Sequence, residues 1–129
     1  APAASLVRRA GGELLVLRVH HPAQPILKWK GDSAARGAAL DAVERSMREE
    51  LASAIGRLGC KARPVVRRVG EGNSAADEIL LAAEKYDADL IALSTRGWSG
   101  LRHLLIGSTA LEVIRKSRHP VMVVRPRLA

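Results

Sequence analysis

Short apolar runs alternate with longer amphipathic stretches along this chain. Glu13–His20, Ala62–Val69, Asp89–Ser94 and Pro120–Arg125 each contain a nearly continuous apolar run, which is typical of a buried strand. Strands separated by amphipathic helices favour a parallel sheet joined by right-handed crossovers. The sequence therefore predicts an α/β fold, with an open parallel sheet that carries helices on both faces.

The stretches between these runs carry helix signals. Ala4–Ala10 ends at a glycine pair, Asp32 or Ser33 can cap a long helix, and Ser74 can cap a third. Ser108–Ser117 is predicted as the last helix, with Leu111 and Ile114 facing inward. The long helix has an apolar stripe at spacings of three or four, formed by Leu40, Val43, Met47, Leu51, Ile55 and Leu58.

The length of the chain fits one domain. Its 129 residues leave no room for a second one, so residues 1–129 are predicted to form a single domain. The chain contains neither an apolar run of about 18 residues nor the pattern of a signal peptide. Cys60 is the single cysteine, which excludes an internal disulfide. We expect a soluble, cytoplasmic protein.

The formal net charge is +8, which favours anionic partners such as nucleotides, nucleic acid or acidic lipid. The basic residues are scattered, however, and no run of five or more is present. A solvated surface explains such a distribution as well as a dedicated polyanion site does. Charge alone therefore names no partner, and nucleic acid is not the partner we expect.

A glycine-rich segment, Ser94–Thr109, follows the third predicted strand and leads into the last predicted helix. Gly97 and Gly100 allow the backbone to approach an anion closely, and Gly107-Ser108 lies at a helix N-terminus, where the dipole is positive. These residues can equally be turn residues and a helix cap, because the P-loop pattern is absent. From the residues alone, both interpretations stay open.

The stretch Asp89–Pro126 is similar to the C-terminal half of universal stress proteins. Members of this family that bind ATP show glycine, two residues, glycine, nine residues, then glycine and Ser or Thr. Gly97, the nine residues Trp98–Ile106, and Gly107-Ser108 match this spacing, and the order of elements agrees over nearly the whole chain. Ser94 stands where the first glycine of the motif is expected.

The resemblance implies a five-stranded sheet whose first strand carries an aspartate that contacts adenine. Nothing before Ser5 can be that strand, so we expect the family domain to be incomplete at its N-terminus in the printed sequence. Glu13–His20 and Asp89–Ser94 would then lie about 9–10 Å apart, twice the spacing of paired strands. Direct pairing between them would contradict this expectation.

The resemblance also implies which residues contact a nucleotide. These are Val19 beside the base, Leu93 and Ser94 beside the ribose, and Gly97, Gly107, Ser108 and Thr109 at the phosphates. Arg96 could pair with a phosphate and offset the replacement of glycine by Ser94. A homodimer is implied through the last strand, at Val121, Met122, Val123, Val124 and Arg125.

The function implied is that of a stress-response sensor or partner-binding dimer that binds ATP, ADP or AMP, with or without Mg²⁺. Any ATP hydrolysis would be slow, because no base positioned for water and no acidic pair for magnesium is evident. His20 and His21 are neighbours whose side chains point apart, so they predict no metal site. Two alternatives remain: a nucleotide-independent interaction dimer, favoured by Ser94, and a polyanion-binding protein, suggested by the charge.

Overall fold

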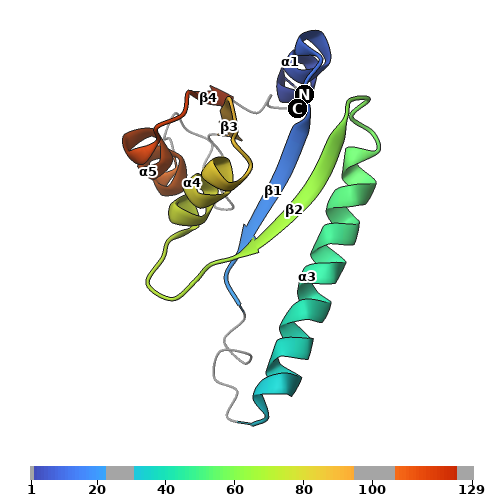
Figure 1. Ribbon diagram of the computed structural model, residues 1–129, viewed down its shortest axis with the longest axis vertical. Coiled ribbons are helices and arrows are strands. Elements are labelled where there is room, and N and C mark those ends of the chain that lie inside the picture. Colours follow the sequence, from blue (N-terminus) through green and yellow to red (C-terminus); the bar gives the residue numbers. More distant parts are fainter. Residues whose placement is uncertain (1, 23–30, 95–106, 125–129) are drawn as a thin grey trace. The chain divides into compact units, whose positions relative to one another are not determined.

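The computed structural model describes residues 2–22, 31–94 and 107–124 of the chain (Figure 1). The chain divides into two compact units, Ala1–Val69 and Gly70–Ala129, and each is described by itself. We call them unit 1 and unit 2. Whether residues 1–129 act as a single domain stays a prediction.

Unit 1 contains a parallel pair of strands with a long helix packed along it (Figure 1). The strands β1 (Leu14–His20) and β2 (Ala62–Arg68) pair in register from Leu14↔Ala62 to His20↔Arg68. The short helix α1 (Pro2–Ala10) precedes β1, and α3 (Ser33–Ile55) joins the two strands. All four elements agree with the predicted ones to within two residues, apart from the C-terminal end of α3. The predicted apolar stripe runs to Leu58, whereas the helix ends at Ile55.

The apolar stripe of α3 faces the strands, with one exception. Leu40 and Ile55 are buried, and Met47, Leu51 and Leu58 are half-buried. Val43, which we expected on this stripe, is exposed. Glu44 faces inward in place of Val43. Glu44 follows Leu40 by four positions and Val43 follows it by three, and on a helix the residue four positions on lies nearer to the same face.

Unit 2 has the same kind of architecture on a smaller scale. Its strands β3 (Ile91–Ser94) and β4 (Val121–Val124) pair in parallel, and its helices are α4 (Ala75–Lys85) and α5 (Ser108–Lys116). The buried core consists of Ala76, Ala83, Ile91 and Val113.

The N-terminus of α4 is closed by a capping box. The amide of Asp77 donates to Ser74 Oγ at 3.2 Å, and the amide of Ser74 donates to Asp77 Oδ2 at 2.8 Å. Two backbone N–H groups of the first turn are thereby satisfied. The predicted cap at Ser74 is confirmed, as is the predicted cap of α3, where the Ala34 amide donates to Asp32 Oδ1 at 2.9 Å.

The inward face of α5 differs from the predicted one. Ala110 and Val113 are buried, whereas Leu111 and Ile114 are 40% and 41% exposed. The core of unit 2 explains the difference, because small side chains on α4 and α5, such as Ala76 and Ala110, allow a close helix contact. The large apolar side chains of α5 therefore do not mark its buried face.

The strands confirm the parallel α/β class. Within the described ranges, β1 pairs with β2 and β3 pairs with β4, and no pairing joins β1 to β3. The four strands observed leave the predicted five-stranded sheet as a prediction. The expected spacing between β1 and β3 also stays a prediction, because these strands belong to different units.

Candidate functional site

The N-terminus of α5 is built differently from those of α3 and α4. Its N-cap is Gly107, with φ −60° and ψ 156°, and no described side chain caps this end. A glycine cap leaves the N–H groups of the first turn, among them those of Ser108 and Thr109, without a side-chain acceptor. Such N–H groups, together with the positive end of the helix dipole, form an anion-binding site.

Two further predicted site residues of unit 2, Leu93 and Ser94, lie on β3. Ser94 is exposed at the carboxyl end of this strand, opposite Val124 of β4. Leu93 packs against the core cluster of unit 2, so Ser94 points to the opposite face of the strand pair. Carboxyl ends of parallel strands are the usual ligand-binding edge of α/β proteins. Ser94 lies at that edge.

Several predicted site residues cannot be related to this arrangement. Arg96, Gly97 and Arg125 lie outside the described residues. Val19 is half-buried near the end of β1 in unit 1. The structure thus brings together Gly107, Ser108 and Thr109 on one helical turn, and the rest of the predicted site stays a prediction.

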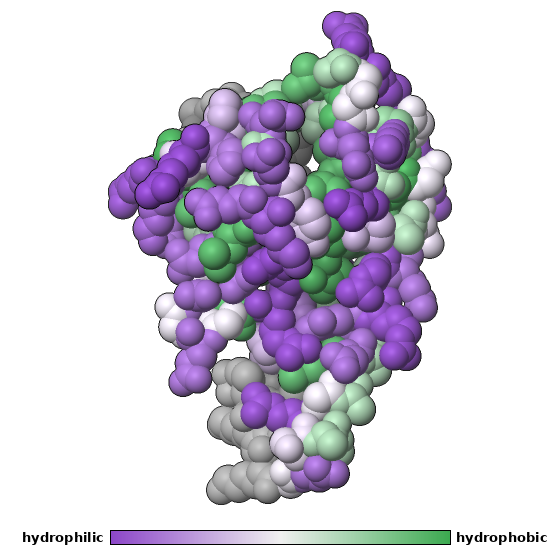
Figure 2. Space-filling model, viewed as in Figure 1, coloured by the Kyte–Doolittle hydropathy of each residue, from purple (hydrophilic) through white to green (hydrophobic). Residues whose placement is uncertain are grey.

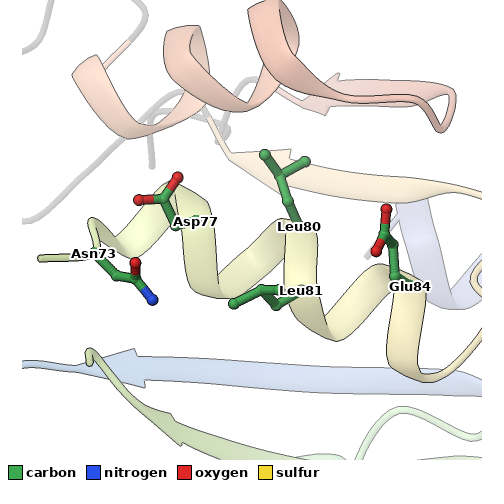
Figure 3. Close-up of a pocket in the computed structure, with 5 residues that line it drawn as sticks. All are labelled: Asn73, Asp77, Leu80, Leu81 and Glu84. Carbon is green, nitrogen blue, oxygen red and sulfur yellow. The ribbon is translucent and has the colours of Figure 1, made fainter. Parts of the chain in front are cut away.

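A hollow beside α4 is unsuited to phosphate. The described residues that line it are Asn73, Asp77, Leu80, Leu81 and Glu84 (Figure 3). It contains no predicted site residue, and the carboxylates of Asp77 and Glu84 would repel an anion. Nothing in its lining offers a positive charge to a nucleotide.

A second polar cluster lies at the carboxyl end of the β1–β2 pair, and sequence reasoning missed it. Glu44 of α3 accepts a hydrogen bond from Arg68 Nε at 2.6 Å, and His20 Nε2 lies 3.3 Å from the same carboxylate oxygen. Arg68 also pairs with Asp41 at 3.6 Å. One carboxylate therefore joins α3 to the last residue of each strand.

This cluster could have been found from one signal. Glu44 lies four positions after Leu40 and so falls on the apolar stripe of α3. An acid on an inward-facing stripe requires a partner, because burying an unpaired charge is costly. The side chains of His20 and Glu44 are only 8% and 16% exposed.

The environment of Glu44 keeps its carboxyl ionised. Burial raises its pKa, but hydrogen bonds and charge from Arg68 and His20 outweigh burial and hold the pKa below the ordinary value of 4.5. The pairing therefore stabilises the folded state at neutral pH, and this contribution is lost as the pH falls through the lowered pKa.

We expect Glu44→Gln to lower the free energy of unfolding by roughly 1–3 kcal/mol at pH 7, because charge-assisted hydrogen bonds are lost. The difference from the unchanged protein should shrink as the pH falls below 4.5, where the carboxyl of the unfolded chain becomes protonated, and should be lost below the lowered pKa of the native carboxyl. Urea denaturation at a series of pH values measures both effects.

A matched control is Glu50→Gln, which removes the exposed partner of Arg18. We expect a cost within about 0.5 kcal/mol there, because exposed ion pairs contribute little. Equal costs for the two variants, or a Glu44→Gln cost that does not change with pH, would contradict this role of Glu44.

The sequence profile of the universal stress protein family matches residues 2–125. The chain belongs to the universal stress protein family. Among curated relatives, it is 48% identical over 50 residues to the universal stress protein MJ0531 of Methanocaldococcus jannaschii, an alignment that covers 39% of this chain and 29% of that protein. The chain thus aligns with less than a third of the length of this relative.

Solved structures show the same fold. One is that of the protein MJ0577 from Methanocaldococcus jannaschii, with a TM-score of 0.68, 22% identity, and coverage of 99% of this chain and 89% of that chain. Another is the universal stress protein from Archaeoglobus fulgidus in complex with dAMP, with a TM-score of 0.61, 22% identity, and coverage of 94% and 80%. The predicted family and fold class are confirmed.

Two further observations concern the described part of the chain. No group of three or more His, Cys, Asp or Glu side chains there could hold a metal ion. No helix among these residues is both long enough and apolar enough to cross a membrane.

Proposed function

We propose that this protein binds ATP, or a related adenine nucleotide such as ADP or AMP, with its phosphates at the N-terminus of α5. One observation carries the proposal: Gly107 caps this helix, and no described side chain occupies the N–H groups that follow it. Gly107-Ser108 is also the final glycine and hydroxyl residue of the family's nucleotide motif. Both features support a phosphate site at this helix N-terminus.

Membership of the family supports the adenine part of the proposal. A protein of the same fold from Archaeoglobus fulgidus is described in complex with dAMP. In the proposed complex, Val19 flanks the base, Leu93 and Ser94 lie beside the ribose, and Gly97, Gly107, Ser108 and Thr109 hold the phosphates, with Arg96 as a further phosphate partner. Bound Mg²⁺ would be held mainly by the phosphates.

Ser94 defines the second candidate function. Its Cβ adds bulk where the motif has glycine, and it lies exposed at the ligand-binding edge of β3. A protein in which this side chain blocks the nucleotide would act as a nucleotide-independent interaction dimer. Ser94→Gly should then create nucleotide binding that the unchanged protein lacks.

A dimer through β4 is part of both candidate functions. Within the described residues β4 pairs on one side only, with β3, so its other edge is open. An open edge of a short apolar strand can pair with a second copy. The proposed interface is Val121, Met122, Val123, Val124 and Arg125.

The proposed role is that of a cytoplasmic sensor or partner-binding module in stress response. Hydrolysis of ATP is at most slow in this proposal, because the residues assigned to the nucleotide include no general base for the attacking water. The binding of the nucleotide, and not the hydrolysis of ATP, would then transmit the stress signal.

Nuclear magnetic resonance can locate the nucleotide directly. On titration with ATP, we expect the largest changes in amide chemical shift at Gly107, Ser108 and Thr109, because these N–H groups would donate to phosphate. Smaller changes are expected at Val19 and Ser94. Saturable shifts confined to another part of the chain would place the nucleotide elsewhere and overturn the proposed site.

A further inference from the structure

The net positive charge of the chain is concentrated in unit 1. Residues 1–69 hold 13 of the 21 Lys and Arg residues but only six of the 13 Asp and Glu residues, which leaves them seven of the eight excess positive charges. Unit 2 is nearly neutral by the same count. The excess positive charge is therefore a property of unit 1.

The fold brings four of these cations to the end of unit 1 where its strands begin. Arg8 Nη1 of α1 donates to the carbonyl oxygen of Leu58 at 2.7 Å, which fixes α1 beside the turn between α3 and β2. The amide of Leu14 donates to the carbonyl oxygen of Lys61 at 2.8 Å, so this turn also adjoins the start of β1. Figure 1 shows α1 and the turn at the same end of unit 1.

We name this cluster the basic pole and define it as Arg8, Arg9, Arg57 and Lys61. All four residues are exposed, and none of them makes an ion pair with another described residue. The acid nearest in the chain, Glu13, is paired with Arg63 at 3.2 Å. In Figure 2, hydrophilic side chains lie beside apolar ones at the end of unit 1 that carries α1. The basic pole thus presents uncompensated positive charge.

The chemistry of the basic pole favours phosphate oxygens. Arg9 and Arg57 carry planar guanidinium groups, which bind phosphate through two parallel hydrogen bonds. Arg8 contributes its charge, because its two Nη atoms already donate to the carbonyl oxygen of Leu58 and to Ser5 Oγ. Charges gathered within about one Debye length, 8–10 Å, act jointly on a polyanion. We propose that the basic pole binds the phosphate backbone of double-stranded nucleic acid without reading its sequence.

Two other polyanions fit this surface less well. Single strands are bound largely by stacking on aromatic side chains, and the described residues of unit 1 include no Phe, Tyr or Trp. Binding to an acidic membrane needs apolar side chains that insert, and Leu6 is the only large apolar side chain of α1 that is exposed. A duplex requires neither feature.

The test measures fluorescence anisotropy of a labelled DNA duplex of about 20 base pairs and mixed sequence, between about 50 and 200 mM salt. We expect a dissociation constant on the order of 10⁻⁴–10⁻⁶ M. The logarithm of the association constant should fall with the logarithm of the salt concentration, with a slope of about −3 to −4 for three or four phosphate contacts. The variant Arg57→Gln/Lys61→Gln should bind at least about tenfold more weakly, with a slope smaller by about two.

The control variant Arg45→Gln/Arg48→Gln removes the same charge from exposed residues of α3 that also form no ion pair among the described residues. Its affinity should fall by less than about threefold, because these side chains lie outside the basic pole. Both variants change only exposed side chains, and equal melting temperatures would show that folding is intact.

Three results would overturn the proposal. Equal losses in the two variants would mean that net charge alone attracts the duplex. Tighter binding to a labelled single strand of the same length would assign the surface to unpaired nucleic acid. Tighter binding to phosphatidylserine vesicles than to the duplex would assign it to a membrane.

Discussion

Gly107→Val is expected to abolish binding of adenine nucleotides. Phosphate oxygens would approach the backbone at the N-cap of α5, and a branched side chain there would occupy the space that they need. We expect the affinity for ATP to fall by at least about 100-fold, because several charge-assisted hydrogen bonds are lost together. Calorimetric titration of ATP into the two proteins measures the difference.

This variant should fold, so the loss would report on the site. Gly107 has φ −60° and ψ 156°, which is extended backbone that valine adopts readily. Replacing glycine at an N-cap by valine costs stability on the order of 1 kcal/mol. Unchanged affinity in Gly107→Val would mean that the phosphates are bound elsewhere.

The matched control is Gly12→Val in the connection between α1 and β1. A Cβ at Gly12 meets nothing within 4 Å, and its φ is outside the left-handed region that disfavours side chains. We therefore expect the affinity for ATP to stay within about twofold of that of the unchanged protein. This result would show that the loss in Gly107→Val depends on where the valine is placed.

Val113→Ala is expected to lower the free energy of unfolding by about 2 kcal/mol, because truncation leaves a cavity in the core of unit 2. Val113 is fully buried and packs in one cluster with Ala76, Ala83 and Ile91. The alanines are too small to extend into the space that is left. Urea denaturation followed by circular dichroism measures the change.

Leu111→Ala serves as the comparison on the same helix. Leucine loses more atoms than valine in this exchange, yet Leu111 is 40% exposed. We expect a cost below about 1 kcal/mol, because much of the removed surface is already in contact with water. A larger cost for Leu111→Ala than for Val113→Ala would show that α5 buries the face predicted from the sequence and not the one observed.

The features that the sequence predicted well depend on neighbouring residues. The caps at Asp32 and Ser74 each need a side-chain oxygen and a backbone N–H a few positions on. The apolar runs of the strands are equally local, and their observed bounds lie within two residues of the predicted ones. Gly107 at the N-terminus of the last helix belongs to the same group of features.

The features that the sequence did not predict depend on contacts between distant segments. Both faces of α5 carry apolar residues three apart, and only the packing against α4 selects Ala110 and Val113. The cluster around Glu44 requires the register that brings His20 opposite Arg68. The four cations of the basic pole are scattered along the chain, and the contact of Arg8 with Leu58 gathers them.

Binding of an adenine nucleotide by this member of the universal stress protein family can be tested by mass spectrometry of the small molecules that leave the purified protein on denaturation. We expect ATP, ADP or AMP in stoichiometric amount, or heat on titration of ATP into protein from which the nucleotide has been removed. Absence of any nucleotide, together with no heat on titration, would contradict it.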